Sequence, residues 1–263
     1  MGKFDGILLC TDFDSTLAVK EQVSQENCDA IRYFQENGGK FTIVSGRHPF
    51  FLKEHLEGFA VNAPLVGYNG AYIIDCDSGE TVYSGGRQDF TALEVAEHFW
   101  NTDERLRRVV VHDRTRNNFR CSRAPLPELN RDFKTLRAQA ELPLYNMLLS
   151  TKEEEEAIAL RDAIRAYVGN SFEVCRSWGI GIEIICPNDT KGMAALRLKD
   201  LLHAKLLVAA GDYENDIPMI RAADIGYAVE NATDEVKSAA DRLTVDCKEH
   251  AIAAIIRELE ESL

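Results

Sequence analysis

The chain has 263 residues, of which 45% are hydrophobic and 28% are charged, and its net charge is −13. This length and composition predict one large domain or two moderate ones with a well-packed core. The negative charge argues against nonspecific binding to nucleic acid or to an anionic membrane surface. It does not exclude an anionic substrate, because a bound metal ion inverts the local charge.

The cysteines and the N-terminus bear on the cellular compartment. The seven cysteines are scattered and form no Cys-x-x-Cys pair, so we expect neither a zinc site nor a disulfide framework. The sequence opens almost at once on a strand, without a signal-peptide pattern, and no apolar stretch is long enough to span a bilayer. We therefore expect a cytoplasmic protein with no membrane partner.

The first third of the chain alternates strand-like and helix-like segments, which favours a parallel sheet with helices on both faces. The glycine pair 38–39 is a stop signal for the first helix. The predicted elements are strands over Phe4–Cys10 and Lys40–Val44, helices over Ser24–Asn37 and Pro49–Leu56, and a hairpin of Tyr72–Asp75 and Thr81–Tyr83.

The pattern changes after residues 85–86 and predicts an α+β module in the middle third. The acidic run Glu153–Glu156 fits the first turn of a helix, where the helix dipole favours negative charge. This module is expected to contain strands over Arg108–Arg114, Asn118–Ser122, Tyr145–Ser150, Ser171–Arg176 and Gly181–Cys186, and helices over 90–100, Glu128–Glu141 and Glu153–Val168.

The last part of the chain returns to the alternating pattern, which indicates a core domain interrupted by an insertion. Its predicted helices cover Lys191–His203, Ile217–Ala222, Asp234–Ala240 and Ala251–Leu259, and its predicted strands cover Leu206–Ala210, Ile225–Val229 and Leu243–Val245.

Two of the apolar strand-like runs end at carboxylates. Asp12 and Asp14 follow the first run, and Asp212 and Asp216 follow the second. Ligands of an open α/β sheet bind just outside the carboxyl ends of its strands, so we expect four carboxylates in one crevice. Residues i and i+2 of an extended segment point to the same side, so Asp12 and Asp14 would face one ligand. Such a group repels itself unless it is protonated or neutralised, which predicts a Mg²⁺ site for phosphate chemistry.

Each of these segments also has a structural interpretation. Asp-x-Asp is common in turns, and Ser45-Gly46-Arg47 after the second strand would cap a helix as readily as it would bind phosphoryl oxygens. Lys191 would ordinarily be a solvated surface lysine. Capping of the helix at 217 would explain one of the three polar groups at Asp212, Asn215 and Asp216.

Taken in chain order, these segments resemble the haloacid dehalogenase superfamily of phosphatases, in particular its Cof-type branch with a type IIB α+β cap. The resemblance implies a Rossmann-like, doubly wound parallel core over residues 1–84 and 188–263, with a substrate-specificity cap inserted over 85–187. The matching motifs are Asp12-Phe13-Asp14-Ser15-Thr16, Ser45-Gly46-Arg47, Asn69-Gly70-Ala71, Lys191-Gly192 and Gly211-Asp212-x-x-Asn215-Asp216.

The resemblance implies Mg²⁺-dependent hydrolysis of small phosphate monoesters through an aspartyl-phosphate. Asp12 would be the nucleophile, Asp14 the general acid and base, and Lys191 a further catalytic residue. The phosphoryl group would be held by the backbone N–H of Phe13 and by Ser45, Gly46, Lys191 and Asn215. The Mg²⁺ ligands would be Asp12, the backbone carbonyl of Asp14, Asp212 and Asp216.

The chain departs from the branch in two places. Ser15 stands where the branch usually has glycine, and we expect serine to be tolerated if φ there is negative. Tyr213 and Glu214 are bulkier and more acidic than the residues often found between Asp212 and Asn215. Glu214 would either enlarge the acidic cluster or point outward.

The resemblance implies a small phosphorylated metabolite as the substrate, and sugar phosphates are the class that we favour. Alternatives are a phosphomutase, or a phosphatase of pyridoxal phosphate or of a flavin nucleotide. A receiver-like binding module is disfavoured, because such domains are about half this length and need no general acid like Asp14. Most of the candidate arginines of the cap would fit ordinary surface charges, and His48 would fit a structural role. The candidate substrate contacts are Arg47, His48 and Asn69 from the core, and Arg114, Arg116, Arg120, Arg123, Trp178 and Glu183 from the cap. The sequence makes no prediction of oligomeric state.

Overall fold

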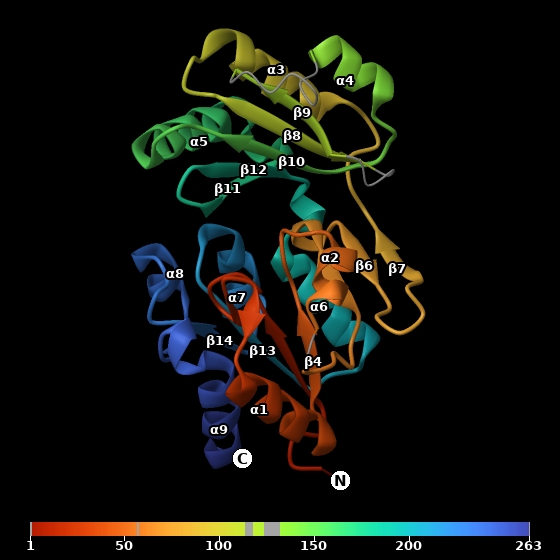
Figure 1. The fold of residues 1–263 in the computed structure, drawn as a ribbon, viewed down its shortest axis with the longest axis vertical. Helices are drawn as coiled ribbons and strands as arrows, with labels where there is room; N and C mark the ends of the chain where they lie inside the picture. The colour runs from red at the N-terminus through yellow and green to blue at the C-terminus, as the bar shows by residue number, and fades with distance from the viewer. Residues whose placement is uncertain (1, 57, 114–117, 124–131, 263) are drawn as a thin grey trace. The chain divides into compact units, whose positions relative to one another are not determined.

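The computed structural model describes residues 2–56, 58–113, 118–123 and 132–262 (Figure 1). Its contacts divide the chain into two units, which are called here the core unit, Met1–Ser84 with Thr190–Leu263, and the insertion, Gly85–Asp189. The sequence-based boundary at 187/188 lies two residues before this division, next to a 3₁₀ turn at Pro187–Asp189. None of the helices in the described ranges has the length and apolar character needed to cross a bilayer.

The core unit is built on a five-stranded sheet in which every neighbouring pair is parallel. Strand β1 is buried along its whole length, which is why its sequence is a continuous apolar run rather than an alternating one. The predicted α/β fold with a parallel sheet is thereby confirmed. The strand order is β15 (Arg242–Leu243), β14 (Ile225–Ala228), β13 (Leu206–Gly211), β1 (Ile7–Thr11) and β4 (Lys40–Ile43).

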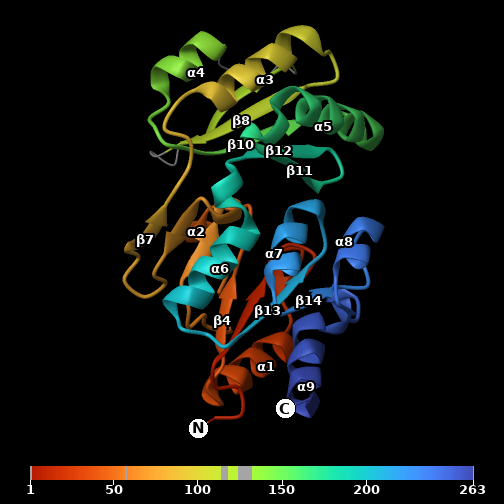
Figure 2. The ribbon, with the colours of Figure 1, turned by 180° about the vertical axis from the view of Figure 1, so that it is seen from behind.

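Helices cover both faces of this sheet (Figures 1 and 2). Helices α1 (Gln25–Glu36) and α9 (Ala251–Ser262) lie side by side on one face, where Asn27 accepts a hydrogen bond from the backbone of Ala253. Helices α6 (Lys191–Leu201) and α7 (Ile217–Ala222) pack on the other, against the alternate residues of β1 and β13. Two short helices, α2 (Pro49–Glu54) and α8 (Asp234–Ala239), complete the core unit.

Two small antiparallel sheets flank the main one. The predicted hairpin is present as β6 (Tyr72–Ile74) and β7 (Thr81–Ser84), and β5 (Leu65–Gly67) pairs with β6. A second hairpin, β2 (Ala18–Val19) with β3 (Gln22–Val23), directly follows the first acidic motif. The sequence did not predict β2, β3 or β5, because two or three residues are too few to show a periodicity.

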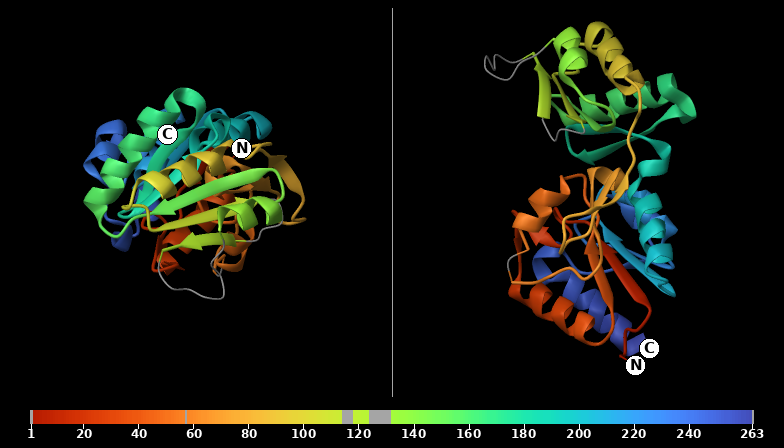
Figure 3. Two further views of the ribbon diagram at one scale, coloured as in Figure 1. Left: turned by 90° about the horizontal axis from the view of Figure 1, so that it is seen from above. Right: turned by 90° about the vertical axis from the view of Figure 1, so that its right-hand side faces the viewer.

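The insertion has its own sheet (Figure 3) and its own hydrophobic core. Helices α3 (Thr91–Thr102), α4 (Phe133–Gln139) and α5 (Glu154–Val168) pack on one face of the sheet and share a hydrophobic cluster with it. The acidic run lies at the start of α5, as predicted, and Glu153 and Glu156 form a capping box there. The sheet is antiparallel, with the order β11 (Glu173–Trp178), β12 (Gly181–Ile185), β10 (Leu144–Ser150), β8 (Arg108–Asp113) and β9 (Asn118–Ser122).

Several predicted boundaries were wrong. The first strand begins at Ile7 rather than Phe4, because residues 3–6 form a turn. The last strand is Arg242–Leu243 rather than Leu243–Val245. Helix α4 begins at Phe133, and the earlier part of the helix predicted from Glu128 lies outside the described residues.

Candidate active site

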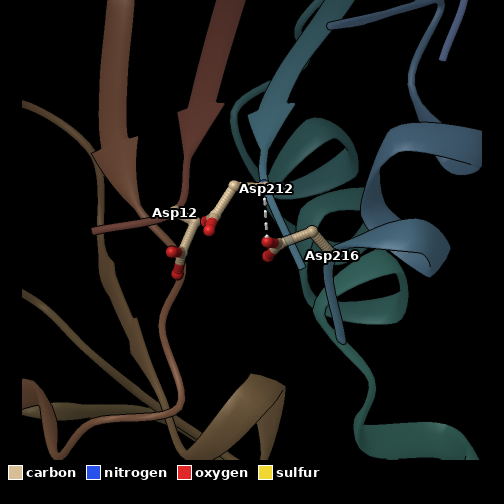
Figure 4. Close-up of side chains that lie close together, drawn as sticks. All are labelled: Asp12, Asp212 and Asp216. Carbon is tan, nitrogen blue, oxygen red and sulfur yellow. Dashed lines mark hydrogen bonds between the residues drawn. The ribbon is translucent and has the colours of Figure 1, made fainter. Parts of the chain in front are cut away.

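Three buried carboxylates converge at the carboxyl ends of two neighbouring strands (Figure 4). Asp12 follows β1 and Asp212 follows β13, and the parallel register of these strands brings the two residues to the same edge of the sheet. Asp216 follows one turn after Asp212, and its carboxylate accepts the backbone N–H groups of Asp212 and Tyr213. One oxygen from each of the three carboxylates lies within 4.8 Å of the other two.

Lys191 enters this group from the first turn of α6. Its side chain is 1% exposed, and its Nζ donates to Oδ1 of Asp12 at 2.6 Å and to Oδ1 of Asp216 at 2.5 Å. Thr190 caps the helix by accepting the N–H of Met193, which fixes the point at which α6 begins. The interpretation of Lys191 as a solvated surface residue is therefore wrong.

Two glycines permit the close approach of these segments. A Cβ on Gly211 would lie 2.4 Å from the Cβ of Asp216, so a larger residue would push Asp216 away from Asp12. A Cβ on Gly192 would lie 2.3 Å from the carbonyl oxygen of Pro218, where α6 packs against α7. Glycine at both positions keeps the acidic group together.

Burial and mutual repulsion dominate the electrostatics of the group. Burial raises the pKa of the Asp12 carboxyl well above its usual range, Lys191 opposes this rise, and the neighbouring carboxylates add to it. Burial, with the charge of Asp216, raises the pKa of Asp212 to about 7. Burial alone would lower the pKa of Lys191, but the carboxylates of Asp12 and Asp216 outweigh it and raise that pKa. One ammonium group therefore faces more negative charge than it neutralises.

The raised pKa of Asp212 predicts how stability depends on pH in the absence of divalent metal. The folded state holds a proton on Asp212 up to about pH 7, whereas an unfolded aspartate has the model value of 3.8. Protonation of Asp212 therefore contributes its full stabilisation of the folded state below about pH 4. This contribution to the free energy of unfolding is lost as the pH rises through 7, at no more than about 1.4 kcal/mol per pH unit. Urea unfolding in chelator at several pH values should show this slope, and Asp212→Asn should reduce it.

The exposed Asp200 supplies the control for this measurement. Asp200→Asn removes one carboxylate without touching the buried group, so the slope should match that of the wild type. An unchanged slope in Asp212→Asn would contradict the assignment of the titration to Asp212.

Asp14 lies outside the group of three carboxylates. Its side chain is 45% exposed and accepts two hydrogen bonds from the guanidinium of Arg47, from Nε at 2.7 Å and from Nη2 at 2.8 Å. A third bond, 2.7 Å from Nη1 to Glu21, ties Arg47 to the turn between β2 and β3. Asp12 and Asp14 do not share one extended segment as expected, because β1 ends at Thr11 and a turn follows. That both side chains face one ligand stays a prediction.

Ser15 occupies that turn with φ of 60°. The negative φ under which we expected serine to be tolerated is therefore not present. A left-handed conformation at a residue other than glycine costs on the order of 1 kcal/mol. Two hydrogen bonds hold Ser15 in place. Its carbonyl accepts one from the side-chain amide of Asn231, and its backbone N–H donates one to the carbonyl of Ala18.

A set of neutral polar groups adjoins the acidic group. Ser45 follows β4 and is buried, and its carbonyl accepts the backbone N–H of Asn69 at 2.9 Å. Asn69 is also buried, with φ of 57°, and its Oδ1 accepts a hydrogen bond from Asn215 at 3.0 Å. Three residues from distant motifs are thus brought together. Helix α2 is capped by His48, whose Nδ1 accepts the N–H of Phe50, so Ser45 is not the cap of this helix.

The sequence reasoning missed two features of the site. The hydroxyl of Thr16 donates to Oδ1 of Asp212 at 2.9 Å and so orients that carboxylate. Thr16 ends the first motif, but nothing in its spacing shows that the turn folds it back toward the next strand. The second feature is the bond of Arg47 to Asp14, for which two opposite charges 33 residues apart give no local signal. Glu214 is buried, and the group of three carboxylates does not include it.

The candidate residues of the insertion that the structure describes come from β9, β11 and β12 and from the residue after β9. The indole of Trp178, 40% exposed, covers Gly181 across the β11–β12 turn. Glu183 is buried and accepts from Asn146. Arg123 stacks on Trp100 and donates to backbone carbonyls, which is a structural role. Arg120 lies on β9, and the predicted contacts Arg114 and Arg116 fall outside the described residues.

The donor set of the acidic group fits a hard divalent cation. Its potential ligands are carboxylate oxygens, which Mg²⁺ prefers, and they are close enough to share one ion. Three carboxylates against a single ammonium group also leave the negative charge that such an ion would neutralise. Asp12, Asp212 and Asp216 are therefore the residues suited to hold it.

Comparison with known proteins bears out the resemblance seen in the motifs. A 5-amino-6-(5-phospho-D-ribitylamino)uracil phosphatase from Bacillus subtilis is 27% identical, over 95% of this chain and 94% of that protein. A pyridoxal phosphate phosphatase from Escherichia coli is 23% identical, over 95% and 97%. A solved haloacid dehalogenase-like hydrolase from B. subtilis shares the fold, with a TM-score of 0.78 and 24% identity over 96% of this chain and 99% of that one.

The family of haloacid dehalogenase-like hydrolases matches residues 9–256, which span every segment of the site described above. The two relatives named above are phosphatases. The chain therefore belongs to the haloacid dehalogenase-like hydrolase family.

Proposed function

We propose that this protein is a Mg²⁺-dependent phosphatase of small phosphate monoesters that forms an aspartyl-phosphate on Asp12. The observation that carries the proposal is the buried group of three carboxylates and Lys191 at the ends of β1 and β13. Phosphoryl transfer needs mainly positioning and charge neutralisation, and a buried site supplies both. The substrates named for the curated relatives, small phosphorylated metabolites, agree with this reaction class.

In this proposal Asp12 attacks phosphorus and the P–O bond to the leaving group breaks. Asp14 donates a proton to the leaving oxygen and then accepts one from the water that hydrolyses the aspartyl-phosphate. Lys191 neutralises charge beside Asp12, while Ser45, Asn215 and the N–H groups of Phe13 and Gly46 hold the phosphoryl oxygens. Mg²⁺ bound by Asp12, Asp212, Asp216 and the carbonyl of Asp14 would supply further neutralisation of the phosphoryl charge.

The proposal also names the substrate classes to be tested. We propose sugar phosphates as the first class to test, and phosphorylated cofactors or their precursors as the second, since the curated relatives include a phosphatase of a ribitylamino-uracil phosphate and one of pyridoxal phosphate. The insertion would act as the cap that selects the leaving group.

The proposed location of the protein is the cytoplasm. All seven cysteines are free thiols, which is consistent with a reducing compartment.

The test is phosphate release from a panel of sugar, cofactor and nucleotide phosphates, with Mg²⁺ or with chelator. The proposal expects release that requires Mg²⁺ and varies strongly with the leaving group. Conversion of a sugar phosphate into its isomer without release would instead indicate a phosphomutase. A folded protein that binds Mg²⁺ but turns over no member of the panel would contradict both reactions.

Arg47 is expected to position Asp14 for its role in proton transfer. Arg47→Lys keeps the charge but cannot bond both oxygens of Asp14 as the planar guanidinium does. We expect kcat to fall about 10- to 100-fold, because misplacing a reacting group by about an ångström has effects of this size. The Tm should hardly change, since an ion pair this exposed contributes about 1 kcal/mol or less.

The matched control is Arg257, an exposed arginine on α9. Arg257→Lys should leave both kcat and Tm at wild-type values. If Arg47→Lys retained full kcat, the positioning role of Arg47 would be refuted.

A further inference from the structure

Two arginines of the insertion lie on the face of its sheet opposite the helices. Successive side chains of a strand point to opposite faces. Val109 and Val111 of β8, and Cys121 of β9, belong to the hydrophobic cluster shared with the helices. Arg108 of β8 and Arg120 of β9 alternate with these residues, so they point to the other face.

The pairing of β8 with β9 makes Arg108 and Arg120 diagonal neighbours. Arg120 is opposite Val110, and Arg108 is opposite Ser122. Diagonal neighbours on one face have Cβ atoms roughly 7–8 Å apart, within reach of two long side chains. Partial burial lowers the pKa of Arg108, and the positive charge of Arg120 lowers it further. The two guanidinium groups therefore repel each other in a partly desolvated place.

Neither arginine of this pair has a carboxylate partner within the ranges that the structure describes. No carboxylate there forms an ion pair with Arg108 or Arg120. The Nε atoms of both arginines are buried and have no hydrogen-bond partner. A buried donor without an acceptor is costly, and more so when it is charged. Arginine presents a fork of N–H donors that matches the oxygens of a phosphate or a carboxylate.

A second unsatisfied group lies on the same face. Asn146 of β10 precedes Met147 of the hydrophobic cluster, so its side chain also points away from the helices. Asn146 is 3% exposed and donates through Nδ2 to Glu183, whereas its Oδ1 is buried without a partner. This oxygen requires a hydroxyl or N–H donor, the complement of what the arginines require.

We infer that Arg108 and Arg120 form a binding site for an oxyanion, the phosphate or carboxylate group of a small metabolite, on the face of the insertion's sheet opposite its helices. Asn146, two strands from Arg120, would accept a hydrogen bond from a hydroxyl or N–H of the same ligand. The oxyanion has two sources. It is the second anionic group of the substrate, an assignment that rests on the proposed phosphatase function, or it is a separate small anion.

Selenate, a tetrahedral oxyanion that is located by its anomalous scattering, tests the site without relying on catalysis. Crystals of the whole protein soaked in selenate together with Mg²⁺ should show selenate bound between Arg108 and Arg120. The double variant Arg108→Gln, Arg120→Gln should lose the selenate at this position and keep any selenate bound beside Lys191. Selenate beside Lys191 but none at the arginines in the wild type would overturn the inference and leave the proposed function standing. Selenate at the arginines, together with no Mg²⁺-dependent phosphate release from any compound of the panel, would support the inference and overturn the proposed function.

Substrate pairs distinguish the two sources of the oxyanion. Glycerol 3-phosphate and 3-phosphoglycerate differ in one carboxylate, and fructose 6-phosphate and fructose 1,6-bisphosphate differ in one phosphate. If the substrate supplies the oxyanion, Arg108→Gln and Arg120→Gln should each lower kcat/KM about 10-fold or more for the doubly anionic member and less than about 2-fold for the other. An equal effect on both members, with selenate bound, assigns the site to a separate anion and overturns its role in substrate choice.

Arg107 is the matched control, because it is exposed, adjacent in sequence and carries the same charge. Arg107→Gln should leave the kcat/KM ratio of each pair unchanged. If it shifted the ratio as much as Arg108→Gln does, the effect would be one of overall charge, and the assigned site would be refuted.

Discussion

Asp12→Asn is expected to lower phosphate release on the order of 10⁴-fold or more, the scale seen when a nucleophile is removed from a catalytic unit. The asparagine amide is nearly isosteric with the carboxylate but cannot form the acyl phosphate. The buried group also loses one of its mutually repelling charges. The variant should therefore be at least as stable in chelator as the wild type. Phosphate release and urea unfolding, measured on one preparation, check both statements.

Asp200→Asn again serves as the control, because Asp200 is an exposed carboxylate on α6 and has no part in the proposed reaction. It should keep wild-type release and stability. Release by Asp12→Asn within about 10-fold of the wild type would rule out Asp12 as the nucleophile.

Lys191→Met is expected to have the largest effect on stability. The buried ammonium is the cation that Asp12 and Asp216 contact directly, and methionine would leave their charges without it. Removing one partner of a buried ion pair typically costs about 3–5 kcal/mol. We expect a loss of this size in urea unfolding at pH 7 in chelator, together with a loss of phosphate release. The defect should shrink as the pH falls, because burial raises the pKa values of Asp12 and Asp212, and protonation removes the negative charge that Lys191 opposes.

Lys199 provides a matched comparison on the same helix. Its ion pair with Asp224 is as short, at 2.6 Å, but the two side chains are 24% and 40% exposed. Lys199→Met should therefore cost less than about 1 kcal/mol. Equal effects of the two substitutions would mean that burial does not set the importance of Lys191.

The elements that place the acidic group could be predicted from the sequence because their signals are local. The apolar runs that become β1 and β13 end at Asp12 and Asp212, and a parallel sheet aligns such ends at one edge. Lys191 opens a helix behind its cap, Thr190, which is also a local pattern. The motifs thus indicated both the fold and the chemistry.

The features that could not be predicted depend on backbone turns and on partners distant in sequence. The left-handed Ser15 lies in the turn that follows β1, and Asp14 in this turn pairs with Arg47, which is 33 residues further along the chain. The contact of Thr16 with Asp212 joins residues 196 positions apart. In the insertion, the arginine pair depends on the register of β8 with β9, which a one-residue shift would destroy.

The most direct test of the central claim is to trap the proposed intermediate. The enzyme would be quenched during turnover with Mg²⁺ and treated with borohydride, which reduces an acyl phosphate to an alcohol and so converts the aspartate to homoserine. Peptide mass spectrometry should find homoserine at position 12, only with substrate present, and at neither Asp212 nor Asp216. Steady phosphate release with aspartate intact at position 12 would contradict the account.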